Sequence, residues 1–140
     1  MFIFSIRSIQ LLNTADKRLG ILANEVLKVS KIDFGITDGW RSQEKQLEYY
    51  QQGKTECDGK NKISKHQIGQ AIDIVCYDPK THKPTYDKKE LYYYIAGLFE
   101  VKTEELNNTI FKYYKEKDKI KIQWGGWWNS EDCPHFELKD

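Results

Sequence analysis

The stretch Ser64–Val75, SKHQIGQAIDIV, places a histidine seven residues before an aspartate that interrupts an apolar run. The run Ala71–Val75 is typical of a buried strand, where an ionised carboxylate is costly unless a cation compensates it. Strand periodicity puts Asp73 on the face opposite Ile72 and Ile74, which can face the core. The sequence therefore predicts a cation beside Asp73.

Length and charge limit what kind of protein this is. The 140 residues predict a single domain spanning 1–140, long enough to bury one core. With 22 basic and 21 acidic residues the net charge is +1, so no basic excess points to nucleic acid. No apolar run approaches the ~20 residues needed to cross a bilayer, and we expect no membrane insertion.

The N-terminal sequence and the cysteines bear on the compartment. Met1–Arg7 is apolar but lacks a basic lead, a long apolar region and a cleavage site, so we expect no signal peptide. Cys57, Cys76 and Cys133 are odd in number and have no CxxC spacing. They favour free thiols in a reducing compartment over a disulfide frame.

Apolar periodicity and turn residues predict helices that flank a few short strands. Because the strands do not alternate strictly with helices, the predicted class is α+β. Helices are expected over 8–30, 43–52, 87–99 and 103–115, and strands over 32–37, 70–76, 120–124 and 135–138. A long exposed loop is expected over 54–65.

The C-terminal stretch Asp132–Leu138, DCPHFEL, supplies a second histidine. If its strand pairs beside Asp73, then His66, Asp73 and His135 converge and offer three ligands to a divalent metal. Zinc sites with three protein ligands and an open fourth position are catalytic and lower the pKa of bound water to about 7. Such a site needs a carboxylate as general base, and Asp132 is the candidate.

Each of these residues also has an ordinary structural interpretation. Asp73 could pair with an interior arginine instead of a metal, and Asp132 could be a loop acid or a cap. Cys133 and His135 could form a thiol–imidazole pair, which we disfavour because no orienting third group is evident. His82 fits a solvated turn residue.

Several blocks of sequence occur in a characteristic order. They are GWRS at 39–42 followed by Gln46, SxHxxGxAxD at 64–73, WGGxW at 124–128 and DxPHFE at 132–137. Together they resemble the zinc D-alanyl-D-alanine carboxypeptidase family, in particular its phage-endolysin branch of L-alanyl-D-glutamate peptidases. The resemblance runs from about residue 32 to 138. It implies a small antiparallel sheet flanked by helices, with zinc in a central cleft.

The resemblance also implies roles for individual residues. It makes His66, Asp73 and His135 the zinc ligands, Asp132 the catalytic base and Arg41 a partner of the substrate carbonyl or oxyanion. Ser64 could bind substrate backbone or only cap a loop, and Trp124 could wall a substrate groove or pack in the core.

These observations lead to three hypotheses of function. The first is a monomeric zinc endolysin that cuts L-Ala–D-Glu in the peptide stem of bacterial peptidoglycan. It would accumulate in the host cytoplasm and act on the wall after release. The second is a D-alanyl-D-alanine carboxypeptidase, and the third is a zinc-stabilised module that binds cell wall without cutting it.

Overall fold

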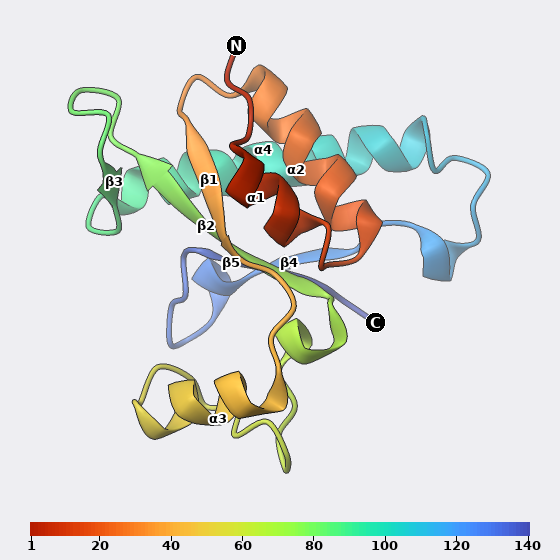
Figure 1. Ribbon diagram of the computed structural model, residues 1–140. Coiled ribbons are helices and arrows are strands. Elements are labelled where there is room, and N and C mark those ends of the chain that lie inside the picture. The colour runs from red at the N-terminus through yellow and green to blue at the C-terminus, as the bar shows by residue number, and fades with distance from the viewer.

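Five strands form one antiparallel sheet in the computed structural model, which describes residues 1–140 (Figure 1). The sheet order is β1-β2-β5-β4, and the short β3 pairs with β2. The strands are β1 Phe34–Asp38, β2 Ala71–Tyr77, β3 Pro84–Thr85, β4 Ile122–Trp124 and β5 His135–Leu138. The predicted α+β class with a small antiparallel sheet is confirmed.

Four helices accompany the sheet: α1 Ile6–Leu12, α2 Lys17–Val29, α3 Gln43–Gln51 and α4 Lys89–Asn108. Figure 1 shows α1, α2 and α4 gathered in one part of the molecule, whereas α3 lies apart from them beyond the sheet. Three short 3-10 turns complete the chain: η1 Lys65–Ile68, η2 Glu116–Asp118 and η3 Gly125–Trp127. None of the helices combines the length and apolar character required to span a bilayer.

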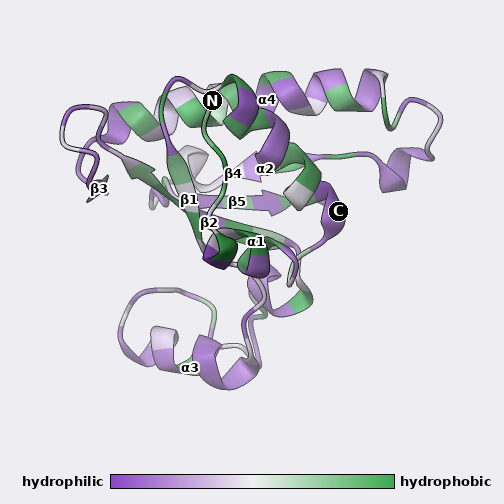
Figure 2. Ribbon diagram, turned by 45° about the horizontal axis from the view of Figure 1, so that its top comes forward, coloured by the Kyte–Doolittle hydropathy of each residue, from purple (hydrophilic) through white to green (hydrophobic).

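The core lies between the sheet and the helices α1, α2 and α4, and α3 carries mostly hydrophilic residues (Figure 2). Ile72 and Ile74 of β2 are fully buried in this core, as strand periodicity predicts. Phe136 of β5 stacks on Phe99 of α4 with ring centroids 4.1 Å apart. The alternation along β2 and β5 therefore sends apolar side chains to the core and leaves Asp73 on the other face.

The single helix predicted over 8–30 is two helices. The Thr14 hydroxyl donates to the Leu11 carbonyl as α1 ends, and the Asp16 carboxylate accepts from the backbone N–H of Arg18 at the start of α2. An aspartate N-cap satisfies backbone donors that a continuous helix would not leave free. The apolar stripe continues across the break, which is why periodicity alone missed it.

The two helices predicted over 87–99 and 103–115 are one helix, α4, that ends at Asn108. Thr103 lies inside α4 rather than at a new start. Beyond the helix the chain forms turns, with Phe111 buried in the core and Tyr113 exposed. The helical stripe of α4 packs against α2 across the predicted break, so tertiary contact overrides the local start signal.

Candidate metal centre

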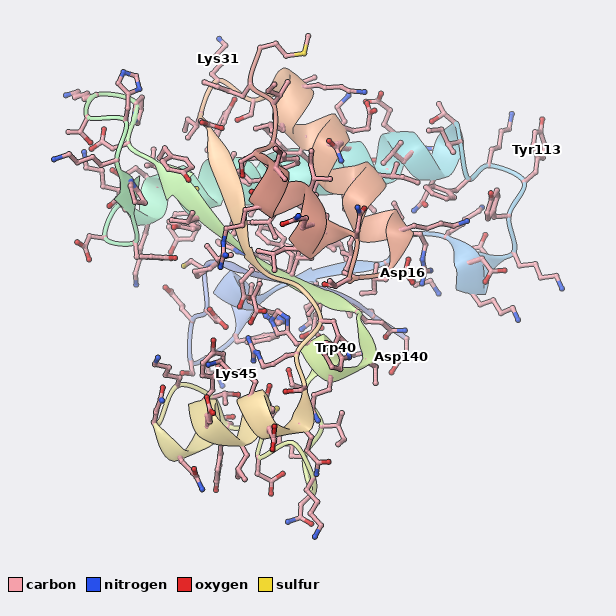
Figure 3. All side chains as sticks on the ribbon, in the orientation of Figure 1. Asp16, Lys31, Trp40, Lys45, Tyr113 and Asp140 are labelled. Atoms are coloured by element: carbon pink, nitrogen blue, oxygen red, sulfur yellow. The ribbon has the colours of Figure 1, made fainter.

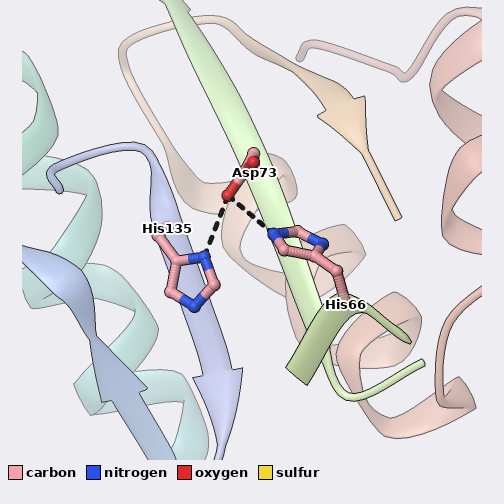
Figure 4. A group of neighbouring side chains, drawn as sticks. All are labelled: His66, Asp73 and His135. Atoms are coloured by element: carbon pink, nitrogen blue, oxygen red, sulfur yellow. Dashed lines mark hydrogen bonds and ion pairs between the residues drawn. The ribbon is translucent and has the colours of Figure 1, made fainter. Parts of the chain in front are cut away.

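Pairing of β2 with β5 brings together the two sequence stretches that carry the predicted ligands. Asp73 stands directly opposite His135 in the antiparallel register. The His135 Nδ1 atom lies 3.1 Å from Asp73 Oδ1, and the His66 Nε2 atom lies 3.2 Å from the same oxygen. Figure 4 shows both imidazole rings directed at this one carboxylate. The three predicted ligand residues therefore meet.

The turn η1 sets the position of His66. The Ser64 hydroxyl accepts from the backbone N–H of His66, and the Gln67 side chain accepts from the backbone N–H of Ser64. This reciprocal capping box fixes the start of the turn. Gly69 ends it with a φ of 71°, a conformation that favours glycine, and the chain then enters β2. The structure thus gives Ser64 a capping role, 8% exposed.

Each imidazole also makes a second hydrogen bond, and these bonds define which ring nitrogen faces Asp73. His66 Nδ1–H donates to the Gly39 carbonyl at 2.7 Å. His135 Nε2–H donates to Glu137 Oε1 at 2.8 Å. A neutral imidazole carries one N–H, so the nitrogen that faces Asp73 in each ring is then a lone-pair acceptor. This outward bonding of ring N–H groups is the usual arrangement around metal-bound histidines.

With both rings neutral, three acceptor atoms point at one another, and either a metal ion or a proton on a ring nitrogen relieves their repulsion. The ligand atoms of His66, Asp73 and His135 all lie within 4.8 Å of one another. Both histidines are buried, whereas the Asp73 side chain keeps 22% of its exposure, so the group is reachable from solvent on one side. Two imidazoles and one carboxylate match the donor set of a three-ligand zinc site. The residues present therefore fit the metal that the sequence predicts.

In the absence of an ion, the close packing of these groups shifts the pKa values of Asp73 and His135. Burial alone would raise the pKa of Asp73, but the charges and hydrogen bonds of His66 and His135 outweigh it and hold that pKa far below its usual range. Burial opposes a charge on His135, yet its hydrogen bonds to Asp73 and Glu137 raise its pKa to about 9. Without an ion, a proton on His135 supplies the positive charge beside Asp73.

Asp132, the candidate base, lies at the rim of the group. Its backbone carbonyl accepts from the backbone N–H of His135, and its own N–H donates to the Gly125 carbonyl. A side chain at Gly125 would collide with the Asp132 backbone, which explains the glycine there. Although Asp132 is exposed, nearby protein atoms displace water and, with the negative charge of Asp73, raise the pKa of its carboxyl.

Arg41 is buried beside Asp73 and is held by several groups. Its backbone N–H donates to the His66 carbonyl at 3.0 Å, which ties the arginine to a ligand residue. Its guanidinium donates to Asp38 and Gln46, and its Nη2 atom lies 3.5 Å from Asp73 Oδ2. The expected arginine partner of Asp73 is therefore present as well, at longer range than the histidines.

The tryptophans near the site divide into core and surface residues. Trp124 is only 4% exposed, and its indole N–H donates to the Cys133 carbonyl. It packs in the core, which is one of the two roles that the sequence left open for it. Trp127 is 55% exposed, and the ring of Trp128 lies 5.1 Å from that of His135. Trp40 is also exposed, and its indole N–H donates to the Gln67 carbonyl in the turn that carries His66.

The sequence analysis gave no role to three groups that the structure places around the site. They are the Gly39 carbonyl, the Glu137 carboxylate and the Asp38 carboxylate. The strand pattern put Glu137 on the face of His135, which was a usable signal. Asp38 lies just beyond the strand predicted over 32–37, and its distance of three residues from Arg41 was the signal available.

Comparison with known proteins agrees with this geometry. A family model described as phage L-alanyl-D-glutamate peptidase matches residues 1–139. Six chains of solved structures match, among them the Serratia marcescens L-Ala D-Glu endopeptidase ChiX, with a TM-score of 0.76 and 25% identity over 98% of this chain and 90% of that one. Comparison with curated protein sequences gives no match. The chain belongs to the phage L-alanyl-D-glutamate peptidase family.

Proposed function

We propose that this peptidase of bacterial peptidoglycan is a zinc enzyme that hydrolyses the L-Ala–D-Glu bond of the peptide stem. The observation that carries the proposal is the convergence of His66, Asp73 and His135, each with an acceptor atom turned inward. The family match and the printed activity of the Serratia structure support the choice of bond.

The residues divide the work by position and charge. Zinc held by the triad would supply Lewis-acid polarisation of the scissile carbonyl and acidify a water molecule. Asp132 is the general base that takes the proton of the attacking water and passes it to the leaving amine. The raised pKa of its carboxyl suits both steps, because a base works best when its pKa approaches the working pH.

Arg41 provides the permanent positive charge on the Asp73 side of the site. Its guanidinium is buried and held by hydrogen bonds, so it needs little reorganisation during the reaction. A preorganised cation of this kind stabilises negative charge that develops on the carbonyl oxygen. The exposed ring of Trp127 and the half-buried ring of its neighbour Trp128 are the surface on which we place the peptide stem.

The test is digestion of purified peptidoglycan by the metal-depleted protein, with and without added zinc, followed by mass analysis of the fragments. We expect zinc-dependent release of stem peptides that begin with D-Glu. Loss of a single alanine from each stem would instead identify a D-alanyl-D-alanine carboxypeptidase. Equal cleavage in the presence of a strong chelator would contradict the role of zinc.

We further propose that the protein acts as a monomer and reaches the wall from the cytoplasm of a bacterial host. The phage family of the chain supports this route. Fractionation of host cells before lysis, together with light scattering of the purified protein, checks both statements.

A further inference from the structure

Two carboxylates stand directly opposite each other at the edge of the site. Asp38, at the end of β1, is the cross-strand partner of Asp73 on β2, next to an irregularity in the register. Like charges that face each other across two strands destabilise the pairing. Arg41 lies against both carboxylates and compensates their charges.

The arginine is shared unequally between the two carboxylates. Its Nε and Nη2 atoms donate to Asp38 Oδ2 at 3.0 and 2.5 Å, whereas Nη2 is 3.5 Å from Asp73 Oδ2. A guanidinium is planar, and each of its two donor edges can engage only one carboxylate side-on. Because Asp38 occupies the Nε–Nη2 edge and Gln46 takes Nη1, Asp73 is left with one long contact.

The other edge of the guanidinium is fixed from the α3 side. Gln46 is fully buried, and its Nε2 donates to the Cys57 carbonyl at 2.8 Å, so its Oε1 is the atom that accepts from Arg41 Nη1 at 2.8 Å. The Tyr49 ring covers the guanidinium, with the Arg41 Cζ atom 4.6 Å from the ring centroid. These contacts hold Arg41 from the side away from Asp73.

We propose that Asp38 is a positioning residue that withholds Arg41 from Asp73 and so preserves Asp73 as a full anionic ligand. The inference rests on the proposed zinc site. A guanidinium released from Asp38 is close enough to form a side-on pair with Asp73, where its permanent charge competes with a metal for the same carboxylate. Gln46 supports Asp38 by restraining the opposite edge of the guanidinium.

Asp38→Asn tests this competition, because asparagine keeps the size of the side chain and removes its charge. We expect zinc affinity, measured by competition with a chromogenic chelator, to fall about tenfold, in the range typical of losses around metal ligands. The matched control is Asp16→Asn, which neutralises another aspartate paired with an arginine, Arg18. Figure 3 shows Asp16 near the start of α2. This control is expected to bind zinc as the wild type does.

A double-mutant cycle separates competition from general damage to the site. In an Arg41→Met background no guanidinium can reach Asp73, so Asp38→Asn is expected to change zinc affinity less than twofold. An NMR readout adds a direct view, since the chain has only three arginines, Arg7, Arg18 and Arg41. The Nε–H resonance of Arg41 is expected to shift in Asp38→Asn and to stay unchanged in Asp16→Asn.

Two results would overturn the proposed role of Asp38. Zinc affinity of Asp38→Asn within twofold of wild type would overturn the inference, as would a loss that persists undiminished when Arg41 is replaced. If Asp38→Asn does not fold, Gln46→Met frees the other edge of the guanidinium without changing charge and is expected to weaken zinc binding in the same direction. A wild-type protein that binds no zinc would instead overturn the proposed function itself.

Discussion

The chain contains two buried or half-buried aspartate–arginine pairs in very different surroundings. Asp16 accepts from Arg18 Nε at 3.0 Å and Nη2 at 2.8 Å, and the remaining guanidinium edge donates to the backbone carbonyl of Lys119. Asp38 accepts from Nε and Nη2 of Arg41 through a single oxygen, Oδ2, and the guanidinium also contacts Gln46 and the charged Asp73. Only in the second pair does the guanidinium form a further ion pair, with Asp73.

The consequence of each ion pair depends on the additional group that the arginine contacts, which is a backbone carbonyl for Arg18 and the Asp73 carboxylate for Arg41. Arg18 ends on a neutral carbonyl, so the Asp16 pair caps α2 and affects folding alone. Arg41 ends beside a candidate metal ligand, so any change in its pairing alters the charge available to an ion. The same substitution is therefore expected to have separate consequences in the two regions.

Removing the charge of Asp73, which distinguishes the Arg41 pair from the Arg18 pair, is expected to have the largest effect. Asp73→Asn eliminates the only anionic ligand, and we expect a loss of zinc affinity greater than the roughly 10–100-fold that changes around ligands cause. Activity on peptidoglycan should disappear. Chelator competition and muropeptide release measure the two effects. Retention of wild-type zinc affinity by Asp73→Asn would remove the basis of the site.

Asp132→Ala tests a carboxylate near the ligands that does not hold the ion. Loss of a general base typically costs about 10²–10⁴-fold in rate, so we expect kcat to fall by that amount. Zinc content, measured by metal analysis of the purified variant, should stay at the wild-type value. An active Asp132→Ala enzyme would require another base.

Glu137→Ala tests a carboxylate of β5 that contacts a ligand histidine without holding the ion itself. The variant removes the acceptor that receives the His135 Nε2–H at 2.8 Å, and the ring loses the bond that orients it. We expect zinc affinity to fall about 10–100-fold, as is usual when the partner of a ligating histidine is removed. Glu131→Ala, a change to an exposed carboxylate on the same segment, is the control and should leave affinity unchanged.

Asp16→Ala is expected to have the smallest effect, confined to stability. Loss of an aspartate N-cap costs about 1 kcal/mol in the free energy of unfolding, with kcat/KM unaffected. The hydrogen bond from Arg18 lowers the pKa of Asp16 in the folded protein. Its contribution is therefore present above the unfolded pKa of about 3.9 and is lost as pH falls through the lower folded pKa.

Urea unfolding of wild type and Asp16→Ala at several pH values measures this dependence. The stability difference between the two proteins should be constant above about pH 5 and shrink below about pH 4. A difference that grows as the pH falls would have the opposite sign and would contradict the lowered pKa.

Alternating burial made the metal site predictable from the sequence. Asp73 interrupts an apolar strand, and His135 alternates with Phe136, so strand parity alone placed both on the polar face. The groups that surround them were not predictable in this way. The bond from His66 to the Gly39 carbonyl joins segments 27 residues apart and uses a backbone atom, which side-chain patterns do not encode.

The helix boundaries were the least predictable part of the fold. The stripe that joins α1 and α2 in the sequence is continuous, and only the Asp16 cap and the bond from Thr14 to Leu11 mark the break. Conversely, acidic residues after Thr103 resemble a helix start, yet α4 runs through them because its apolar face packs on α2. Helix start and stop signals in the local sequence are therefore overridden by tertiary packing.

Because Asp73 is directly paired with His135, the register of β5 against β2 determines whether the two ligands meet. If β5 slid by one residue along β2, His135 would turn into the hydrophobic interior and Phe136 would take its place beside the carboxylate. A misaligned molecule would thus lose its metal and its core packing together. Inserting or deleting one residue between η3 and β5 therefore tests folding and activity as one property.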